Sequence, residues 1–204
     1  ECMTEKVCFT NVVASSKDIM KIKEDIEIPA NKPNIGKVLW DQITFSELDS
    51  KATDVGVHIR GRMDVFVIYK PEDELAPVQY MNATREFQDT ISCDGIDEDM
   101  ILDDIISVGR GSVTVRADDD GEDRVLQIES SLNVDIKVYE DVEADLLKDM
   151  FSYSAQVEPV RSSFSYENLL MRNNAKTRVT RMERLKSSQP SVMQIVNVTG
   201  SVDI

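Results

Sequence analysis

The stretch Arg124-Val-Leu-Gln-Ile-Glu-Ser-Ser-Leu-Asn-Val-Asp-Ile-Lys-Val-Tyr139 has the clearest pattern in the chain. Its apolar side chains recur at every second position, and polar or charged residues fill most of the positions between them. That period of two predicts a β-strand with one buried face and one exposed face.

A second alternating stretch runs from Val57 to Tyr69, with Gly61 midway and with Phe66 and Ile68 adding apolar groups to its other face. This pattern predicts a central strand covered on both sides, whose glycine marks a bulge or a close approach. The two stretches align with each other at an offset of 69 residues. A weak internal duplication is one interpretation, and the other is that any two alternating strands align once their parity matches.

Turn signals separate the expected strands. Asp120-Gly121 predicts a hairpin turn, and Lys70–Pro77 predicts a loop because its prolines oppose continued strand pairing. Apolar residues at spacings of three and four predict short helices over Ile35–Trp40, Glu143–Met150 and Tyr166–Met171.

Together these signals predict a mainly β fold, an antiparallel sandwich or barrel-like set of modules with a few short accessory helices. We expect an N-terminal segment over residues 1–35, a first β module over 36–110 and a second over 111–204, with the second as a candidate diverged repeat. The chain starts with Glu and ends in a strand-like run, so we expect a piece of a longer protein.

Length and charge limit the classes of function. A chain of 204 residues and 23.0 kDa is long enough to bury a core without metal or disulfide. Its formal charge of −15 disfavours binding to nucleic acid or to an anionic membrane. The three cysteines indicate reduced thiols in a cytosol-like compartment, and no apolar run reaches the roughly 20 residues that a membrane span needs.

Motifs for metal and acid-base chemistry are weak. His58 is the only histidine and lies on the polar side of its strand, which disfavours catalysis and a histidine-based zinc site. The run Asp118–Asp123 resembles a calcium loop, but Arg116 would then occupy the first ligand position. Acid pairs such as Asp103-Asp104 are common in so acidic a chain, and Gly109-Arg-Gly111 lacks the rest of a nucleotide loop. We therefore expect no catalytic residue, no metal and no cofactor.

One stretch differs from the rest in charge. Between Met171 and Ser187 lie six basic residues and one acid, a local charge of +5. Such a basic stretch could pair within the fold, bind an acidic ligand, or dock on an acidic surface of another protein or another copy. For the docking alternative, the predicted interaction residues are Lys176, Arg178, Arg181 and Arg184.

Several stretches then resemble, in their order, the SPOCS domain of clostridial spore coat assembly proteins. They are Ile28-Pro-Ala-Asn-Lys-Pro-Asn-Ile35 with Val38-Leu-Trp40, Gly61-Arg-Met-Asp-Val-Phe-Val-Ile-Tyr69 with Pro77-Val-Gln79, Asp120-Gly-Glu-Asp-Arg124, Arg178-Val179, Gln194-Ile195 and Gly200-Ser-Val-Asp203. The resemblance runs from about Glu24 onward, with departures at Ala30 and at Glu86-Phe87.

The resemblance implies a noncatalytic structural and protein-interaction module for spore coat or envelope assembly. It implies localisation in the mother-cell cytoplasm and then on the spore envelope. The implied partners are other coat or envelope proteins, the coat basement-layer ATPase and further copies of the chain, with no nucleic acid and no membrane insertion. Two alternatives stay open: a cell-wall glycan-binding module, which needs surface aromatics in a row, and an acid-pair hydrolase, which needs two carboxylates across a groove.

Overall fold

The computed structural model describes residues 2–156, 158, 160, 162–163, 165–172, 178–182, 184 and 186–200. The regular structure in this part of the chain is all β. It consists of β1 (Cys2–Glu27), β2 (Ile35–Thr53), β3 (Gly56–Pro71), β4 (Gln79–Ile91), β5 (Ile101–Ala117) and β6 (Asp123–Met150).

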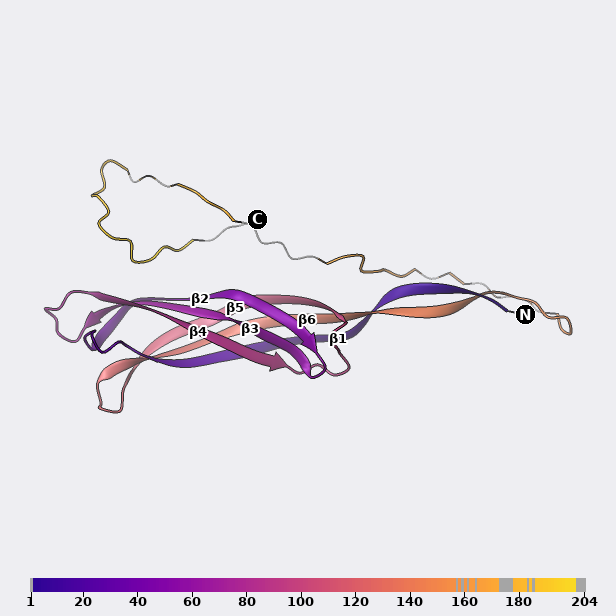
Figure 1. Cartoon of the computed structure of the whole chain (residues 1–204), viewed down its shortest axis with the longest axis horizontal. Coiled ribbons are helices and arrows are strands. Elements are labelled where there is room, and N and C mark those ends of the chain that lie inside the picture. The colour runs from indigo at the N-terminus through magenta and orange to yellow at the C-terminus, as the bar shows by residue number, and fades with distance from the viewer. Residues whose placement is uncertain are drawn as a thin grey trace.

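These strands form two antiparallel sheets of three strands each, which pack as two layers (Figure 1). Sheet A has the order β1-β6-β5 and sheet B the order β2-β3-β4. Edge strand β2 lies beside β5 and edge strand β4 beside β1, but these pairs are not joined into a closed barrel. The predicted mainly β sandwich is thus confirmed, and both stretches with the clearest alternation are central strands. The division into modules and the duplication stay predictions.

The core lies between the two sheets, and the central strands supply most of it. Every second residue from Leu126 to Val138 of β6 is buried, and the same holds from Val57 to Tyr69 of β3 except at half-buried Gly61, which follows directly from their alternating sequences. The largest fully buried side chains are Tyr69, Ile35, Ile59, Met63, Leu126, Ile128, Leu132, Ile136, Val57, Val65, Val67 and Val134.

The three predicted short helices are wrong. Ile35–Trp40 lies in β2 and Glu143–Met150 in β6, while Tyr166–Met171 has no regular structure. In β6 the alternation of the core half continues through Val142, Ala144 and Leu146, and pairing with β1 decides the conformation. The strand period was therefore the stronger signal, and the spacing of three and four was incidental.

The predicted hairpin turn is confirmed, and the predicted loop over Lys70–Pro77 begins two residues later than expected, because Lys70 and Pro71 still pair with β2 at the end of β3. Asp118–Glu122 joins β5 to β6 as a hairpin, with Gly121 at a φ of 83° that favours glycine. The close approach expected at Gly61 is also present, because a Cβ there would meet Leu48 Cδ2 and Phe87 Cζ at 2.8 Å. Gly109 and Arg110 belong to a β-bulge in β5 rather than to a nucleotide loop.

The connection between the two sheets is held by two side chains. The guanidinium of Arg124 donates to the carbonyls of Ile28, Pro29 and Lys32 and to the side-chain oxygen of Asn34. The hydroxyl of buried Tyr69 donates to the carbonyl of Pro33 at 3.1 Å. These bonds satisfy backbone acceptors in the segment between β1 and β2 and fix its path.

Sheet A extends beyond the sandwich as a two-stranded ribbon. Residues Cys2–Asn11 of β1 pair with Glu140–Met150 of β6, and β5 starts pairing only at Tyr139. Figure 1 shows this ribbon leaving the two-layered body toward the N-terminus, with the chain after β6 running back along it. One ribbon face carries Val7, Phe9, Val142, Ala144 and Leu146, all half-buried. Among the described residues no sheet opposes that face, so its burial depends on the ribbon itself and on the chain that follows β6.

Candidate interaction surface

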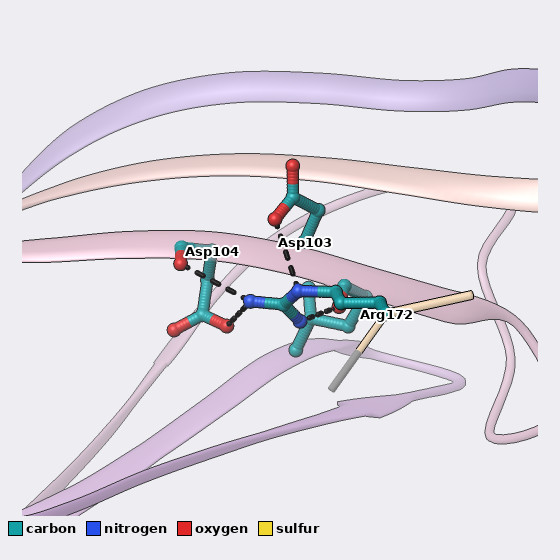
Figure 2. A network of polar contacts seen from close by, with 4 residues as sticks. Asp103, Asp104 and Arg172 are labelled. Atoms are coloured by element: carbon teal, nitrogen blue, oxygen red, sulfur yellow. Dashed lines mark hydrogen bonds and ion pairs between the residues drawn. The ribbon is translucent and has the colours of Figure 1, made fainter. Parts of the chain in front are cut away.

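The first residue of the basic stretch pairs within the fold. Arg172 Nε lies 3.0 Å from Asp103 Oδ1, and its Nη2 lies 3.1 Å from Asp104 Oδ1. Figure 2 shows the two carboxylates on either side of the guanidinium. The intramolecular alternative for the basic stretch therefore holds for Arg172.

The same guanidinium also binds the open edge of β5. Its Nη1 donates to the carbonyl of Leu102, and its Nη2 donates to the carbonyl of Asp104 at 3.3 Å. These carbonyls are two residues apart, so both point away from β6, where a further strand would otherwise pair. Arg172 thus occupies backbone acceptors of an edge strand.

Asp104 explains why an arginine is needed there. It shares its face of β5 with Leu102 and Ile106, opposite Val138, Ile136 and Val134 of the core. Only 13% of the Asp104 side chain is exposed. A carboxylate at such a site is costly without a counter-charge, and Arg172 provides one. The two groups line a cavity of about 340 Å³ with Leu48, Asp49 and Ser50 of β2, at the seam between the sheets.

The predicted interaction residues lie further along the chain. Lys176 falls outside the described residues. Arg178, Arg181 and Arg184 have exposed side chains, and the described residues around them form no strand or helix. Their role in docking stays a prediction.

A second side chain of the segment after β6 binds the other edge of sheet A. The Asn168 carboxamide accepts from Thr10 N–H at 3.0 Å and donates to the Cys8 carbonyl at 3.0 Å. Leu169 N–H donates to Thr10 Oγ1, and the Tyr166 ring contacts Phe9 edge-to-face at 6.3 Å. Sequence reasoning missed Asn168, because nothing near it in the chain indicates which strand it reaches.

Sheet B presents a charged groove at a β-bulge in β2. Residues Glu47–Asp49 bulge out opposite Arg60 and Arg62, and Glu47 has a φ of 54°. Arg60 Nη2 lies 2.7 Å from Asp49 Oδ2, and Arg62 Nη2 lies 2.9 Å from Glu47 Oε2. With Glu86 and Gln88 of β4 they line an open groove of about 760 Å³. Each of the two arginines in this groove is thus paired with a carboxylate of β2.

Trp40 does not lie in a helix, contrary to the prediction over Ile35–Trp40. Trp40 lies in β2 with 41% of its surface exposed, in a row with Phe66 of β3 and Tyr80 of β4. Ring centroids are 5.6 Å apart for Trp40 and Phe66 and 6.1 Å for Phe66 and Tyr80. Tyr80 stacks on Phe66 and also has Lys32 Nζ 5.1 Å from its ring centroid. Cross-strand packing and a cation–π contact thus engage most of this row.

The segment after β6 also reaches this aromatic row. Gln194 Nε2 donates to the Tyr80 hydroxyl at 3.1 Å, and Asn197 Nδ2 donates to Gln42 Oε1 at 3.1 Å. These bonds join side chains to side chains, unlike those of Asn168 and Arg172, which engage the strand edges.

The residues of the weak metal-binding and catalytic motifs interact with neighbouring residues of the fold. His58 is half-buried and lies 3.2 Å from Thr90 Oγ1 on the neighbouring strand. Asp118 accepts from the N–H groups of Asp120 and Glu122, as in a turn closed by its own carboxylate. No cluster of His, Cys, Asp or Glu suited to a metal occurs among the described residues.

Two of the three cysteines lie on the ribbon, and the third lies in the body between β4 and β5. Cys2 and Cys8 are exposed on the ribbon, whereas Cys93 is buried in the body, and all are free thiols. Burial raises the pKa of the Cys93 thiol, and the nearby Asp94 and Asp18 raise it further. Within the part of the chain that the structure describes, no helix has the length and apolar character to span a bilayer.

A comparison with known protein families gives a match for part of the chain. Residues 34–115 match the family model described as SipL, SPOCS domain. The matched segment covers β2, β3, β4 and nearly all of β5. No curated protein and no solved structure matches the chain. The match confirms the resemblance expected from Gly61–Tyr69 and its neighbours, and over the remaining residues that resemblance stays a prediction. Residues 34–115, 82 of the 204 residues of the chain, are thus similar to the SPOCS domain of the SipL family.

Proposed function

We propose that this protein is a noncatalytic structural module that helps to assemble the spore coat or spore envelope. It acts as a scaffold or tether through strand edges and charged surfaces. The SPOCS match over residues 34–115 carries the proposal. The proposed partners are other coat or envelope proteins, including the coat basement-layer ATPase, and the proposed location is the mother cell and then the spore envelope.

The geometry supports a role in being bound by other proteins. Both sheets end in edge strands, and edge strands present backbone groups that accept a neighbouring strand. The basic side chains of Arg178, Arg181 and Arg184 are exposed on a chain whose total charge is −15. Such a separation of charge favours association with acidic surfaces.

The aromatic row does not favour the glycan-binding alternative. A glycan platform presents open ring faces, but the Tyr80 ring stacks on Phe66 and has the Lys32 ammonium 5.1 Å from its centroid. Trp40 and Tyr80 are 41% and 38% exposed, and Trp40 contacts Phe66 edge-to-face. A pull-down with insoluble peptidoglycan is the direct measurement, and retention that depends on Trp40 would support the glycan alternative against the scaffold.

The test is capture of partners from sporulating cells with the full chain as bait. We expect coat or envelope proteins to be captured, and charge reversal at Arg178, Arg181 and Arg184 to reduce the capture. Reversal at Lys37, Arg85 and Arg110, which are exposed on the strands, is the matched control. Capture that is absent with the unaltered chain would contradict the scaffold proposal. Equal loss with both triple variants would contradict a specific role of the basic stretch.

A further inference from the structure

The connection between β4 and β5 contains a turn at Asp94-Gly95, one of the two Asp-Gly pairs in the chain. The other pair, Asp120-Gly121, lies in the hairpin between β5 and β6. We propose that Asp94 is a site of spontaneous covalent modification, at which aspartate converts to isoaspartate, and that the hairpin protects Asp120 from the same reaction. The inference goes beyond the proposed scaffold role and does not depend on it.

The reaction uses only groups of the chain and water. The Gly95 nitrogen attacks the Asp94 carboxyl carbon Cγ, a new N–Cγ bond forms, and the carboxyl hydroxyl leaves as water with the amide proton. The resulting five-membered succinimide then takes up one water molecule. Hydrolysis at its main-chain carbonyl breaks the original peptide bond to Gly95 and leaves the chain running through Cγ. Hydrolysis at the other carbonyl restores aspartate.

Access to the reacting groups is similar at the two pairs. Gly95 and Gly121 have φ of 77° and 83°, and a Cβ on either would meet no heavy atom within 4 Å beyond the adjacent residues. Glycine also lacks the side chain that shields the nitrogen of other residues. Asp94 and Asp120 are both exposed, so water reaches them. Exposure therefore does not distinguish the two pairs.

Hydrogen bonds hold the Asp120-Gly121 pair in place. Gly121 N–H donates to the Asp118 carbonyl at 3.1 Å. The Asp118 carboxylate also accepts from Asp120 N–H at 3.0 Å and from Glu122 N–H at 2.9 Å. These bonds direct the Gly121 nitrogen toward Asp118 and fix the turn around it. Attack on Asp120 Cγ requires that the bond from Gly121 breaks, which slows the reaction.

The Asp94-Gly95 pair lacks such bonds. Within the described part of the chain, Gly95 N–H donates no hydrogen bond and the Asp94 carboxylate accepts none. The bonds nearby hold the later part of the same connection, where Asp99 N–H donates to Asp97 and Lys51 pairs with Glu98. The Gly95 nitrogen is therefore free to approach Asp94 Cγ.

The neighbours of the Asp94-Gly95 pair connect the modification with the core. Cys93 and Ile96 are 8% and 5% exposed and belong to the core cluster. Isoaspartate adds one main-chain atom between these two buried residues, so both cannot keep their positions. We therefore expect the Cys93 thiol to become more accessible once Asp94 is converted.

The test is incubation of the full chain at neutral pH, followed by trypsin digestion and electron-transfer mass spectrometry, which distinguishes isoaspartate from aspartate. Trypsin places the two Asp-Gly pairs in separate peptides, residues 86–110 and 117–124. We expect isoaspartate to form at least about fivefold faster at Asp94, since the net worth of one hydrogen bond corresponds to about this factor in rate. Equal rates, or a faster reaction at Asp120, would overturn the inference.

Two controls show whether the fold causes the difference. In concentrated urea both turns are lost, so the two rates should become similar. An unchanged ratio in urea would assign the difference to the sequence and contradict the inference. Asp118→Ala removes the two carboxylate bonds of the hairpin, so it should speed the reaction at Asp120 and leave that at Asp94 unchanged. An unaltered rate at Asp120 would contradict its protection by the hairpin.

Asp94→Glu tests the effect on the core. Glutamate keeps the charge at this exposed position, but its reaction requires a six-membered ring and is much slower. After incubation under reducing conditions, Cys93 in the unaltered chain should be alkylated faster than in fresh protein, whereas Cys93 in Asp94→Glu should not. An equal gain in both proteins would contradict the link between the modification and the core.

Discussion

The two halves of β6 share one alternating pattern and differ in burial. From Leu126 to Val138 the inward side chains are almost fully buried against sheet B, whereas Val142, Ala144 and Leu146 are only half-buried in the ribbon. The period of the sequence is the same in both halves. What differs is the opposing layer, since a strand face is buried only where another layer covers it.

The largest expected effect separates a core leucine from a ribbon leucine. Leu132→Ala leaves a cavity in the body and should lower the free energy of unfolding by about 2–5 kcal/mol. Leu146→Ala removes the same atoms from the half-buried ribbon face and should cost less than about 1 kcal/mol. Urea denaturation measures both. Equal costs would contradict the distinction between body and ribbon.

Polar interactions should show the same difference with a smaller amplitude. Arg124→Lys loses the forked donors that hold three carbonyls between β1 and β2, and should lower the free energy of unfolding by about 1–3 kcal/mol. Lys6→Ala breaks the exposed ion pair with Glu143 on the ribbon. It should change the free energy of unfolding by less than about 0.5 kcal/mol. Thermal and urea unfolding measure the free energy of unfolding of both variants. A larger loss for Lys6→Ala than for Arg124→Lys would contradict the distinction between body and ribbon.

Tyr69 sharpens the comparison through pH. Burial raises its pKa in the folded state, with Arg124 opposing the shift. The unfolded chain therefore releases this proton first, so stability present below about pH 10 should decline as the pH rises further. Tyr69→Phe should cost about 1 kcal/mol at neutral pH and reduce this alkaline decline. Urea midpoints at several pH values test this, with exposed Tyr153→Phe as the control.

The thiols give the mildest probe of the two regions. Cys2 and Cys8 on the ribbon should react with an alkylating reagent in the native protein, whereas buried Cys93 should react only after unfolding. Its raised pKa slows the reaction further, because the thiolate is the reactive form. Mass spectrometry of the modified chain counts the labelled sites. Rapid native labelling of Cys93 would show that the body opens easily.

The fold class could be predicted because alternation is a local property of the sequence. Val57–Tyr69 and Arg124–Tyr139 indicated the central strands, and Asp120-Gly121 indicated the hairpin. The expected helix over Glu143–Met150 failed because apolar residues near the end of β6 fit two periods at once, and long-range pairing with β1 selected one of them.

The edge contacts were less accessible to sequence reasoning. One usable signal was Asp104, an acid in step with Leu102 and Ile106 at inward positions, which requires a counter-charge. Nothing in the sequence identifies Arg172 as that partner or brings Asn168 to β1, since both contacts span long stretches of chain. Such pairings depend on the path of the segment after β6, which carries no regular pattern.

Arg172 and the exposed arginines that follow it in the chain should differ in their response to ionic strength. The Arg172 guanidinium is held by two carboxylates and by carbonyls of β5 and is only 26% exposed, so its contacts should respond weakly to added salt. Association through Arg178, Arg181 and Arg184 should weaken as counterions screen those guanidinium groups. A salt titration should therefore release a partner bound through these three side chains while the intramolecular contacts of Arg172 persist.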